Sequence, residues 1–579
     1  MASPPRASLL LALAAYLSMV APPVAVRPLW AQGKDSSEVL RRAQDAQARF
    51  ERYRVQHLPL SFGYGRPRCD EVIGRFCFWH DEGADQPPPE PHRIRVARDS
   101  LIAVLDRAAA SLSGDAWIAG QRVRYLVEQE RSVEALAAAR TCAAETWWCR
   151  ALQGLALHTA GDFAGANAAY DAALADMPEQ ERCAWNDISL LLEDPIHERY
   201  EESSCVERED MENRFWWLAQ PLHLVPGNDV RSEHFARITT ARIEERSRTT
   251  HSLRWGNDLL ELRIRYGWPT RWSRERPSTT SLNGPSTIGH EPSPSFYFLP
   301  SPGAIDQPLR ASAGDWDFDA DRPRHRYAPS YASHFAPLEH QAALFRRGDS
   351  LLIVAAYDVS RDTALAGAPL TAGLIVSARD PEVRIMTRLD SVVGGGALVA
   401  MAPDRPLLFS LEVVSEARRA AARARYAVHA SSTGDALRLS ELLLFQPRGE
   451  LPTTLDEVLP TALGSLKLHQ GSSVGLYWEV YGQPQAIEPL VATLDVEPVD
   501  RPALRRAVEA IGLAARPTRV KMRWQDGPSS VASAFARTLA VNLSSLRRGR
   551  YRMKLTVAGN DGPLLSTTRN IEIVDAERD

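Results

Sequence analysis

The stretch RWGNDLLELRIRYGWPTRW (Arg254–Trp272) marks the point at which the sequence changes character. Before it the chain reads as helices with paired cysteines, and after it come prolines and then strand patterns. Inside the stretch apolar and charged residues alternate, with Leu260, Leu262, Ile264 and Tyr266 on one side and Glu261, Arg263 and Arg265 on the other. This period of two predicts a half-buried strand. Gly267 and Pro269 predict the turn that ends it, because glycine permits unusual backbone angles and proline fixes φ.

The same stretch resembles the hallmark of the bacterial GWxTD-domain family, in which a tryptophan, an aspartate, an apolar strand and a YGxP turn follow in that order. These places are filled by Trp255, Asp258, Tyr266, Gly267 and Pro269, which together with Trp268 form the hinge motif. The chain departs from the family where Gly256 follows the tryptophan and where Asn257 replaces a threonine. The resemblance covers this stretch and, loosely, the chain up to Pro337. It implies an envelope or secreted protein, and it gives no catalytic residue to carry over.

Length and composition bound the class of protein. A chain of 579 residues is too long for one core, so we expect several domains. Hydrophobic content of 44% and charged content of 24% are ordinary for a globular protein. The net charge of −4 gives no general attraction to nucleic acid or to anionic membranes, so no nucleic-acid partner is expected. Arginine carries nearly all the positive charge, because lysine occurs only at positions 34, 467, 521 and 554.

The first residues have the pattern of an export signal. Arg6 supplies a short basic region, and Leu9–Val20 is an apolar run too short to anchor the chain in a bilayer. Cleavage is expected near Ala31, with Ala25 as a second candidate, so the signal peptide spans residues 1–31. No later run of about twenty apolar residues follows, so no transmembrane segment is expected in the mature chain. The predicted location is the periplasm or the extracellular space.

Six cysteines lie between Cys69 and Cys205. An even number of cysteines in an exported protein predicts disulfides, although six cysteines allow fifteen pairings. Pairing between nearest neighbours is favoured, which gives Cys69–Cys77, Cys142–Cys149 and Cys183–Cys205. Metal or haem binding is the alternative, but the sequence has no CxxC or CxxCH motif to support it.

Residues 32–250 are predicted to form a helical domain. It contains a pattern that resembles the tetratricopeptide repeat, carried by Gly154, Leu157, Ala166, Tyr170, Ala173 and Pro178. Gly120 precedes Gly154 by one repeat period of thirty-four residues. Such repeats often bind peptides on a concave face, and the alternative is a helical bundle that packs only against neighbouring domains.

Residues 251–345 combine the hinge motif with a proline-rich segment. Eleven prolines lie between Pro269 and Pro337, and loops of this length without structure are uncommon in a domain. The segment keeps eight aromatic residues that a free linker would not hold in water: Phe296, Tyr297, Phe298, Trp316, Phe318, Tyr327, Tyr331 and Phe335. We therefore expect it to wrap over the chain and to clamp the helical half onto the first β domain.

From residue 346 the pattern changes to a period of two. Runs such as LLIVAAYDV, PLLFSLEVV and LRLSELLLF predict short strands separated by turns. These strands predict two antiparallel immunoglobulin-like sandwiches, at residues 346–450 and 461–579, with a short helix near Arg501–Leu513. The expected fold class is therefore a multi-domain protein, α-helical first and β-rich afterwards.

Three motifs suggest chemistry but fail on their context. The run Gly471–Gly475 matches the GxSxG elbow of hydrolases, yet a strand pattern follows it and no histidine lies after His469. Four aspartates alternate along Asp315–Asp321, where a solvated face is favoured over a looser calcium site. Neighbouring histidine and acidic residues such as Glu233 and His234 form no HExxH motif. No catalytic, cofactor-binding or metal-binding residue is predicted.

Two functions remain open from the sequence. The first is an exported scaffold or binding protein of the cell envelope, which would present surfaces to a protein or cell-wall partner. The second is an envelope hydrolase acting on glycan or peptide, with a cleft at the helical/β junction near Trp255 and Asp258. A pocket with converging carboxylates beside Trp255 or Asp315 would favour the hydrolase, and a filled junction would favour the scaffold.

Overall fold

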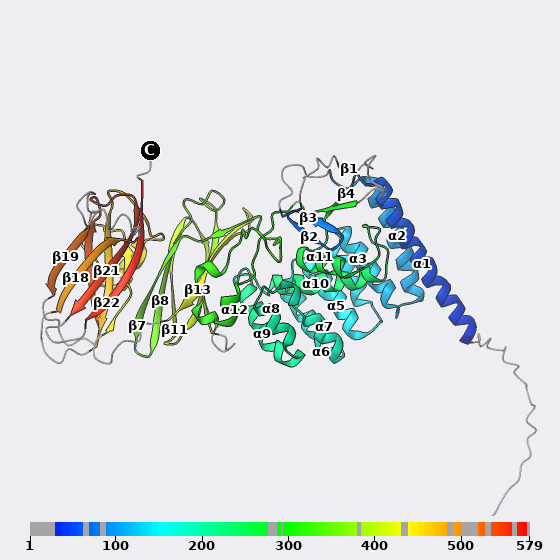
Figure 1. The fold of residues 1–579 in the computed structure, drawn as a ribbon, viewed down its shortest axis with the longest axis horizontal. Helices are drawn as coiled ribbons and strands as arrows, with labels where there is room; N and C mark the ends of the chain where they lie inside the picture. The colour runs from blue at the N-terminus through cyan, green and yellow to red at the C-terminus, as the bar shows by residue number, and fades with distance from the viewer. Residues whose placement is uncertain are drawn as a thin grey trace, which may run out of the picture.

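Most helices lie at one end of the molecule, with two small sheets beside them, and the larger sheets lie at the other end (Figure 1). The computed structural model describes residues 29–61, 69–80, 88–275, 287–291, 293–378, 384–429, 438–482, 490–499, 519–526, 534–558 and 564–575. The predicted signal peptide therefore lies almost wholly outside the described residues, and its expected end at Ala31 falls inside the first helix. Among the described residues, no helix is both long and apolar enough to cross a membrane.

The helices that precede the hinge motif in the described part of the chain form most of the helical half. They are α1 (Leu29–His57), α2 (His92–Ser111), α3 (Ala116–Glu128), α4 (Ser132–Arg140), α5 (Thr146–Thr159), α6 (Phe163–Asp176), α7 (Glu179–Asn186), α8 (Ile196–Glu202), α9 (Cys205–Ala219) and α10 (Asp229–Glu245). Local sequence fixes several starts: the side chains of Asp115 and Asp162 accept hydrogen bonds from the first turns of α3 and α6. Ser204 and Glu207 form a capping box at the start of α9.

Helices α3 to α6 pack in sequence, and α10 lies against α3, α5 and α6. Gly154 on α5 allows this close approach, because a Cβ atom there would lie 2.7 Å from the ring of Tyr170 on α6. Phe235 and Ile243 of α10 belong to the same apolar core as Tyr170. A helix of the chain itself therefore covers this surface of α3, α5 and α6.

All six cysteines form disulfides in the nearest-neighbour pairing. Cys69–Cys77 closes a hairpin of β2 (Glu71–Ile73) and β3 (Phe76–Phe78). Cys142–Cys149 joins the end of α4 to α5, and Cys183–Cys205 joins α7 to α9. Each bond closes a short loop, for which the chain-entropy model gives about 2 to 4 kcal/mol of stabilisation.

The strand predicted at residues 260–266 is wrong, because residues Asn257–Tyr266 form helix α11. Gly267 ends the helix with φ of 78°, a conformation that side chains other than glycine rarely adopt. The two arginines that suggested an exposed strand face do not face water: Arg263 and Arg265 are buried, whereas Leu260 is 37% exposed. Arginines buried by ion pairing therefore produced a false period of two.

A small sheet and an irregular segment follow α11. Strand β4 (Arg271–Glu275) lies between β1 (Leu60–Ser61) and β5 (Thr287–His290). Residues 293–333 then contain α12 (Pro302–Asp306) and two 3₁₀ turns, Pro308–Arg310 and Ala313–Asp315. Most of their aromatic residues are buried.

The first β unit has two sheets around one apolar core. One sheet has the order β10-β9-β12-β13-β6, and the other the order β11-β8-β7. The strands are β6 (His334–Pro337), β7 (His340–Arg347), β8 (Ser350–Asp358), β9 (Leu370–Ser377), β10 (Arg384–Val392), β11 (Gly395–Pro403), β12 (Leu407–Ser415) and β13 (Ala420–Val428). The unit thus begins near residue 334, earlier than the predicted boundary at 346.

The second β unit also encloses a core between two sheets. In one sheet β17 pairs with β14, β15 and β20, and the other has the order β16-β22-β21-β18-β19. The strands are β14 (Arg438–Leu439), β15 (Leu443–Phe445), β16 (Lys467–His469), β17 (Ser473–Tyr481), β18 (Leu490–Pro498), β19 (Val520–Asp526), β20 (Ala534–Asn542), β21 (Gly549–Ala558) and β22 (Leu565–Val574). The sequence predicts residues 438–445 as part of the first unit, whereas β14 and β15 pair with β17 of the second unit. Between β15 and β16 lie α13 (Leu455–Val458) and a 3₁₀ turn. The helix expected at Arg501–Leu513 lies outside the described residues.

Candidate functional site

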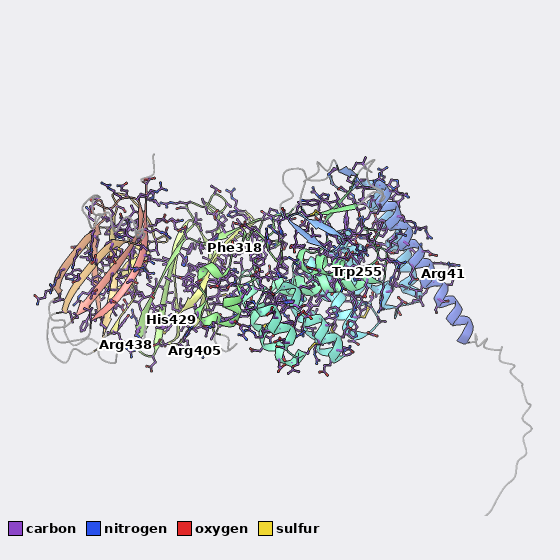
Figure 2. The ribbon with its side chains drawn as sticks, viewed as in Figure 1. Arg41, Trp255, Phe318, Arg405, His429 and Arg438 are labelled. Atoms are coloured by element: carbon purple, nitrogen blue, oxygen red, sulfur yellow. A yellow bond between two sulfur atoms is a disulfide. The ribbon has the colours of Figure 1, made fainter. Side chains whose placement is uncertain are left out.

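The helical half, residues 293–333 and the sheet β10-β9-β12-β13-β6 meet in one apolar core, which we call the seam. Figure 2 places Phe318 between the helices and the strands, and Trp255 among the helices. The helical half contributes Phe215, Trp216 and Ile264 from its helices and Leu222 from the loop after α9. Residues 293–333, which we call the middle segment, contribute Phe296, Phe298, Trp316, Phe318 and Tyr327, and the sheet contributes Ile375, Leu408, Val414 and Ala421. Side chains from three separate parts of the chain therefore fill the junction.

The hinge motif lies on the helical side of the seam, where it holds the disulfide-closed hairpin. The carboxylate of Asp258 accepts hydrogen bonds from Nε and Nη2 of Arg75 at 2.5 and 2.7 Å. Arg75 also donates its backbone N–H to Asp258 and Nη2 to the carbonyl of Arg254. These hydrogen bonds from Arg75 lower the pKa of Asp258 to about 2. Asp258 is thus an ionised, fully engaged structural group at neutral pH.

The last turn of α11 also contacts the same hairpin. Arg265 donates to both carboxylate oxygens of Glu71, at 2.6 and 3.0 Å, and the hydroxyl of Tyr266 donates to Glu71 at 2.7 Å. The ring of Tyr266 stacks on Phe78 with 3.9 Å between ring centroids. Asp258 and Tyr266 therefore both contact the disulfide-closed hairpin, and both stabilise it.

The remaining residues of the motif shape the exit from α11. Trp268 packs partly buried against the helical core, and Trp255 is half-buried. Pro269 lies against Gly289 of β5, where a Cβ atom would clash with the proline ring. Gly267 lets the chain turn beside the guanidinium of Arg237.

Arg237 on α10 connects α11 to the middle segment. Its Nη1 donates to the carbonyls of Ile264 and Arg265, two of the last carbonyls of α11, at 3.0 and 2.9 Å. Its Nη2 donates to the carbonyl of Arg326 at 2.6 Å, and its Nε to Glu233 at 2.6 Å. One buried guanidinium thus satisfies backbone groups from two segments that adjoin it.

A second polar group is buried where α5 and α10 meet the middle segment. His158 lies 2.9 Å from the hydroxyl of Ser232 and 2.6 Å from the carboxylate of Glu233. The arrangement has the residue types of a hydrolytic triad, but Ser232 is fully buried and donates its hydroxyl to the carbonyl of Asp229. Tyr331 donates to Asp229, whose pKa burial raises to about 6. With no exposure at Ser232, the group holds elements together and presents no nucleophile.

Side chains of the first β unit donate hydrogen bonds to carbonyls at the end of α9. Strand β13 is buried on both faces, and Arg423 and Arg425 point to the helical side. Arg425 donates to the carbonyls of Leu218 and Gln220 at 3.0 and 2.7 Å and forms an ion pair with Glu412, in which both side chains are fully buried. Glu412 also accepts the backbone N–H of Leu224 at 3.0 Å. The helical half and the first β unit are thus joined by charged as well as apolar contacts.

The residues of the motifs that suggested chemistry have structural roles. Asp315 accepts hydrogen bonds from Ser301 and from Ser312 and ends a 3₁₀ turn. Trp316 and Phe318 are buried while Asp317, Asp319 and Asp321 face water, as expected for a solvated face. Ser473 of the GxSxG match is the first residue of β17, which gives the strand that the sequence indicated.

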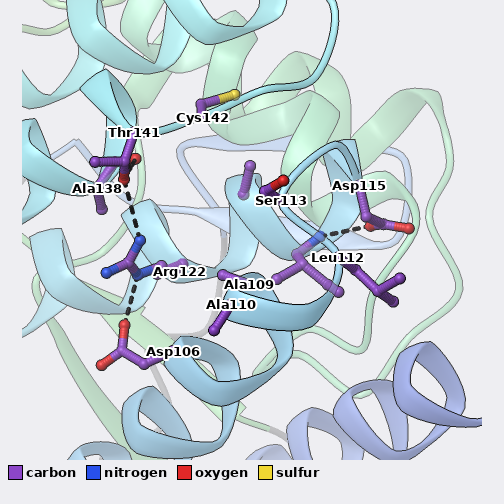
Figure 3. A pocket seen from close by; sticks show the side chains of 12 residues that line it. Asp106, Ala109, Ala110, Leu112, Ser113, Asp115, Arg122, Ala138, Thr141 and Cys142 are labelled. Carbon is purple, nitrogen blue, oxygen red and sulfur yellow. Dashed lines mark hydrogen bonds and ion pairs between the residues drawn. The ribbon is translucent and has the colours of Figure 1, made fainter. Parts of the chain in front are cut away.

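Two hollows lie away from the seam. The first, of about 230 Å³, is lined by residues of α2, α3 and α4, and in it Arg122 reaches from Asp106 toward Thr141 (Figure 3). The second is an open surface hollow beside the Cys183–Cys205 disulfide, lined in part by Glu179 and Asp187. In the described part of the chain, no three histidine, cysteine or acidic residues are grouped to hold a metal ion.

Sequence reasoning missed the buried arginines and their acidic partners. The signal that was available is AAARARYAV, in which arginines alternate with alanines inside a strand pattern. A strand with Arg423 and Arg425 on one face and small apolar residues on the other reads as an exposed sheet face. Their burial depends on Glu412 of the neighbouring strand β12 and on the carbonyls at the end of α9, which lie about 200 residues away in sequence.

The buried carboxyl of Glu212 on α9 is expected to make the free energy of unfolding depend on pH, and this dependence tests the packing around α9. Burial raises the pKa of Glu212 to about 7 from 4.5, although the hydroxyl of Tyr200 donates to it at 2.7 Å. Because the folded pKa is raised, this contribution to stability is full below pH 4.5 and is lost as the pH rises through 7. The loss amounts to roughly 2 kcal/mol once solvent screening is allowed for.

We expect Glu212→Gln to flatten the fall in the free energy of unfolding between pH 5 and pH 8. Glutamine still accepts the hydrogen bond from Tyr200 and has no charge to bury. Urea unfolding at both pH values measures the change, and Glu209→Gln, at an exposed position on the same helix, serves as the control. An unchanged slope in Glu212→Gln would show that the carboxyl is not buried as described.

Comparison with known proteins adds little to this geometry. No family model matches the sequence, and no curated protein matches it. Among solved structures, red sea bream transglutaminase matches with 9% identity, over 41% of this chain and 32% of that chain, at a TM-score of 0.13. The match spans about a third of that enzyme, and at this TM-score it carries no argument about the fold or activity of this chain.

Proposed function

We propose that the protein is an exported, non-enzymatic scaffold of the bacterial cell envelope that presents surfaces to a protein or cell-wall partner. The observation that carries the proposal is the seam, where aromatic residues of the middle segment pack between the helices and the first sheet. A second apolar core joins the two β units through Phe345, Leu443, Phe445 and Tyr477. Three units connected by continuous cores hold their surfaces at fixed relative positions, which is what a scaffold requires.

Export is supported by the three disulfides, because such bonds persist in oxidising compartments. The signal-like pattern of residues 1–31 supports the same location. The resemblance to the GWxTD family at Trp255–Pro269 is consistent with an envelope protein, and in this chain those residues secure the disulfide hairpin.

We also propose the finer architecture that the sequence suggests. Helices α3 to α6 are two tetratricopeptide-like repeats, an assignment supported by the contact between Gly154 and Tyr170. Since α10 lies on α3 and α5, the repeats serve to build the body, and partners bind elsewhere. The two β units are immunoglobulin-like sandwiches, supported by two mainly antiparallel sheets around a core in each.

The test separates a scaffold from a hydrolase. The full chain is produced in an exporting bacterium, and intact mass spectrometry of the periplasmic fraction is expected to show loss of about the first 31 residues. The purified protein is then incubated with cell-wall sacculi. Sedimentation with the sacculi, without release of soluble sugar or peptide, supports the scaffold, whereas release of fragments supports the hydrolase. Retention of the full-length chain in the cytoplasm would refute export.

A further inference from the structure

The second β unit has one sheet face that is turned away from its core. In the sheet β16-β22-β21-β18-β19, alternate residues such as Leu494, Met553 and Ile571 enter the core, so the residues between them point outward. The outward residues are Arg519, Lys521 and Arg523 by β19, Thr493, Asp495 and Glu497 on β18, Arg550, Arg552, Lys554 and Thr556 on β21, and Ser566, Thr568, Asn570 and Glu572 on β22. We call this surface the cationic face.

The charge of this face is opposite to that of the whole chain. Its six basic and three acidic residues leave an excess of three positive charges, while the net charge of the chain is −4. Three of the four lysines in the sequence lie on this sheet: Lys467, Lys521 and Lys554. Lys467 forms an ion pair with Glu339, which leaves the other two on the open part of the face.

Four of the cations are available to a partner. Lys521, Arg523, Arg552 and Lys554 are exposed, and within the described chain none of the four forms an ion pair. Asp495 lies opposite both Lys521 and Lys554 in the ladder. Its carboxylate accepts two hydrogen bonds from Arg519. The acidic residue nearest to the lysines is therefore already neutralised.

Sheet geometry sets the spacing of these charges. Lys521 and Lys554 flank Asp495 on neighbouring strands, which places their backbones about 10 Å apart. Arg523 and Arg552 lie two residues from the lysines along their strands, about 7 Å away. A linear polymer with one anionic group every few ångströms would meet several of these cations at once.

The residues between the cations favour a polysaccharide over a membrane. Thr493, Thr556 and Ser566 form one row across three strands, beside Thr568 and Asn570. Hydroxyl and amide groups donate and accept hydrogen bonds, as sugar hydroxyls do, and they add no apolar area that would enter a bilayer. The sheet lies at the opposite end of the molecule from α1, so this face is far from the helical end (Figure 1).

From this geometry we infer that the cationic face binds an anionic polysaccharide, one that bears carboxylate or phosphate groups. The inference deepens the proposed function, because it names the chemistry of the envelope partner, and it rests on that function only for where the polymer is met. Binding is electrostatic and is therefore expected to weaken as salt is added.

The experiment measures binding of the full-length protein to polygalacturonate by biolayer interferometry, with neutral dextran as the uncharged polymer. Lys521→Gln/Lys554→Gln is expected to weaken binding about tenfold, since two screened contacts are lost. Lys521→Arg/Lys554→Arg is expected to bind as the parent does. The matched control is Arg140→Gln/Arg182→Gln, which removes the same charge from exposed positions of the helical half.

Each outcome decides the inference. Equal loss in the control pair, equal binding to neutral dextran, or binding to vesicles of anionic phospholipid but not to the polymer would overturn it. Polymer binding by the purified protein does not depend on export, so retention of the chain in the cytoplasm would refute the proposed function alone. Circular dichroism of each variant confirms that the exposed substitutions leave the fold intact.

Discussion

Replacing Glu412 by alanine is expected to lower the free energy of unfolding by about 3 to 5 kcal/mol. Glu412 and Arg425 are both fully buried, and their ion pair lies 3.1 Å apart in the middle of the seam. Removal of the carboxylate leaves the cation of Arg425 buried without a counter-charge. It also leaves the N–H of Leu224 and the hydroxyl of Ser410 without their acceptor. The loss therefore combines an unpaired charge with two broken hydrogen bonds.

Urea unfolding of the variant measures this loss. Glu416→Ala, at an exposed position just after the same strand, is the control and is expected to change stability by less than about 0.5 kcal/mol. The double variant Glu412→Leu/Arg425→Met is expected to recover part of the loss, because neither charge is then buried. A loss below about 1 kcal/mol in Glu412→Ala would mean that water reaches the pair, and that the seam is less tightly packed than its contacts indicate.

The sequence predicts the features of this protein that depend on local rules. The disulfide pairs follow from short separations, and the change from helices to strands follows from the change in apolar period. The burial of Phe298 and Trp316 follows from composition, since so many aromatic residues do not remain in water. Each of these conclusions needs only residues that are close together in the chain.

The errors arise where distant residues decide the structure. The sequence predicts Arg263 as a solvated residue. In the structure Nε and Nη2 of its guanidinium donate to the carboxylate of Glu244 on α10, at 2.9 and 3.0 Å. The same holds for Arg265 and Glu71, which lie almost two hundred residues apart in sequence. The sequence of α11 therefore predicts a strand, because the acidic partners of its arginines cannot be identified from that sequence alone. The boundary between the β units was misplaced for a related reason, since residues 438–445 pair forward with β17.

Truncating Phe298 to alanine is the second substitution with a large expected effect. Phe298 is fully buried in the seam, and its ring lies 4.9 Å from that of Phe335 and 5.8 Å from that of Phe318. Loss of a buried phenylalanine costs about 3 to 5 kcal/mol, from lost apolar burial and from the cavity left behind. Because this cavity opens between the helical half and the first sheet, we expect the middle segment to loosen first.

Limited proteolysis shows whether the loss is local to the seam. Phe345→Ala is the matched control, because Phe345 is also fully buried but lies in the core between the two β units. Both variants are expected to lose similar stability, yet only Phe298→Ala is expected to gain early cleavage sites within residues 293–333. If both variants were cut there at the same rate, cleavage would follow global unfolding, and the middle segment would not be the element that clamps the two halves together. Selective cleavage in Phe298→Ala would instead assign the rigidity of the scaffold to the middle segment, because the substitution removes only one side chain from the seam.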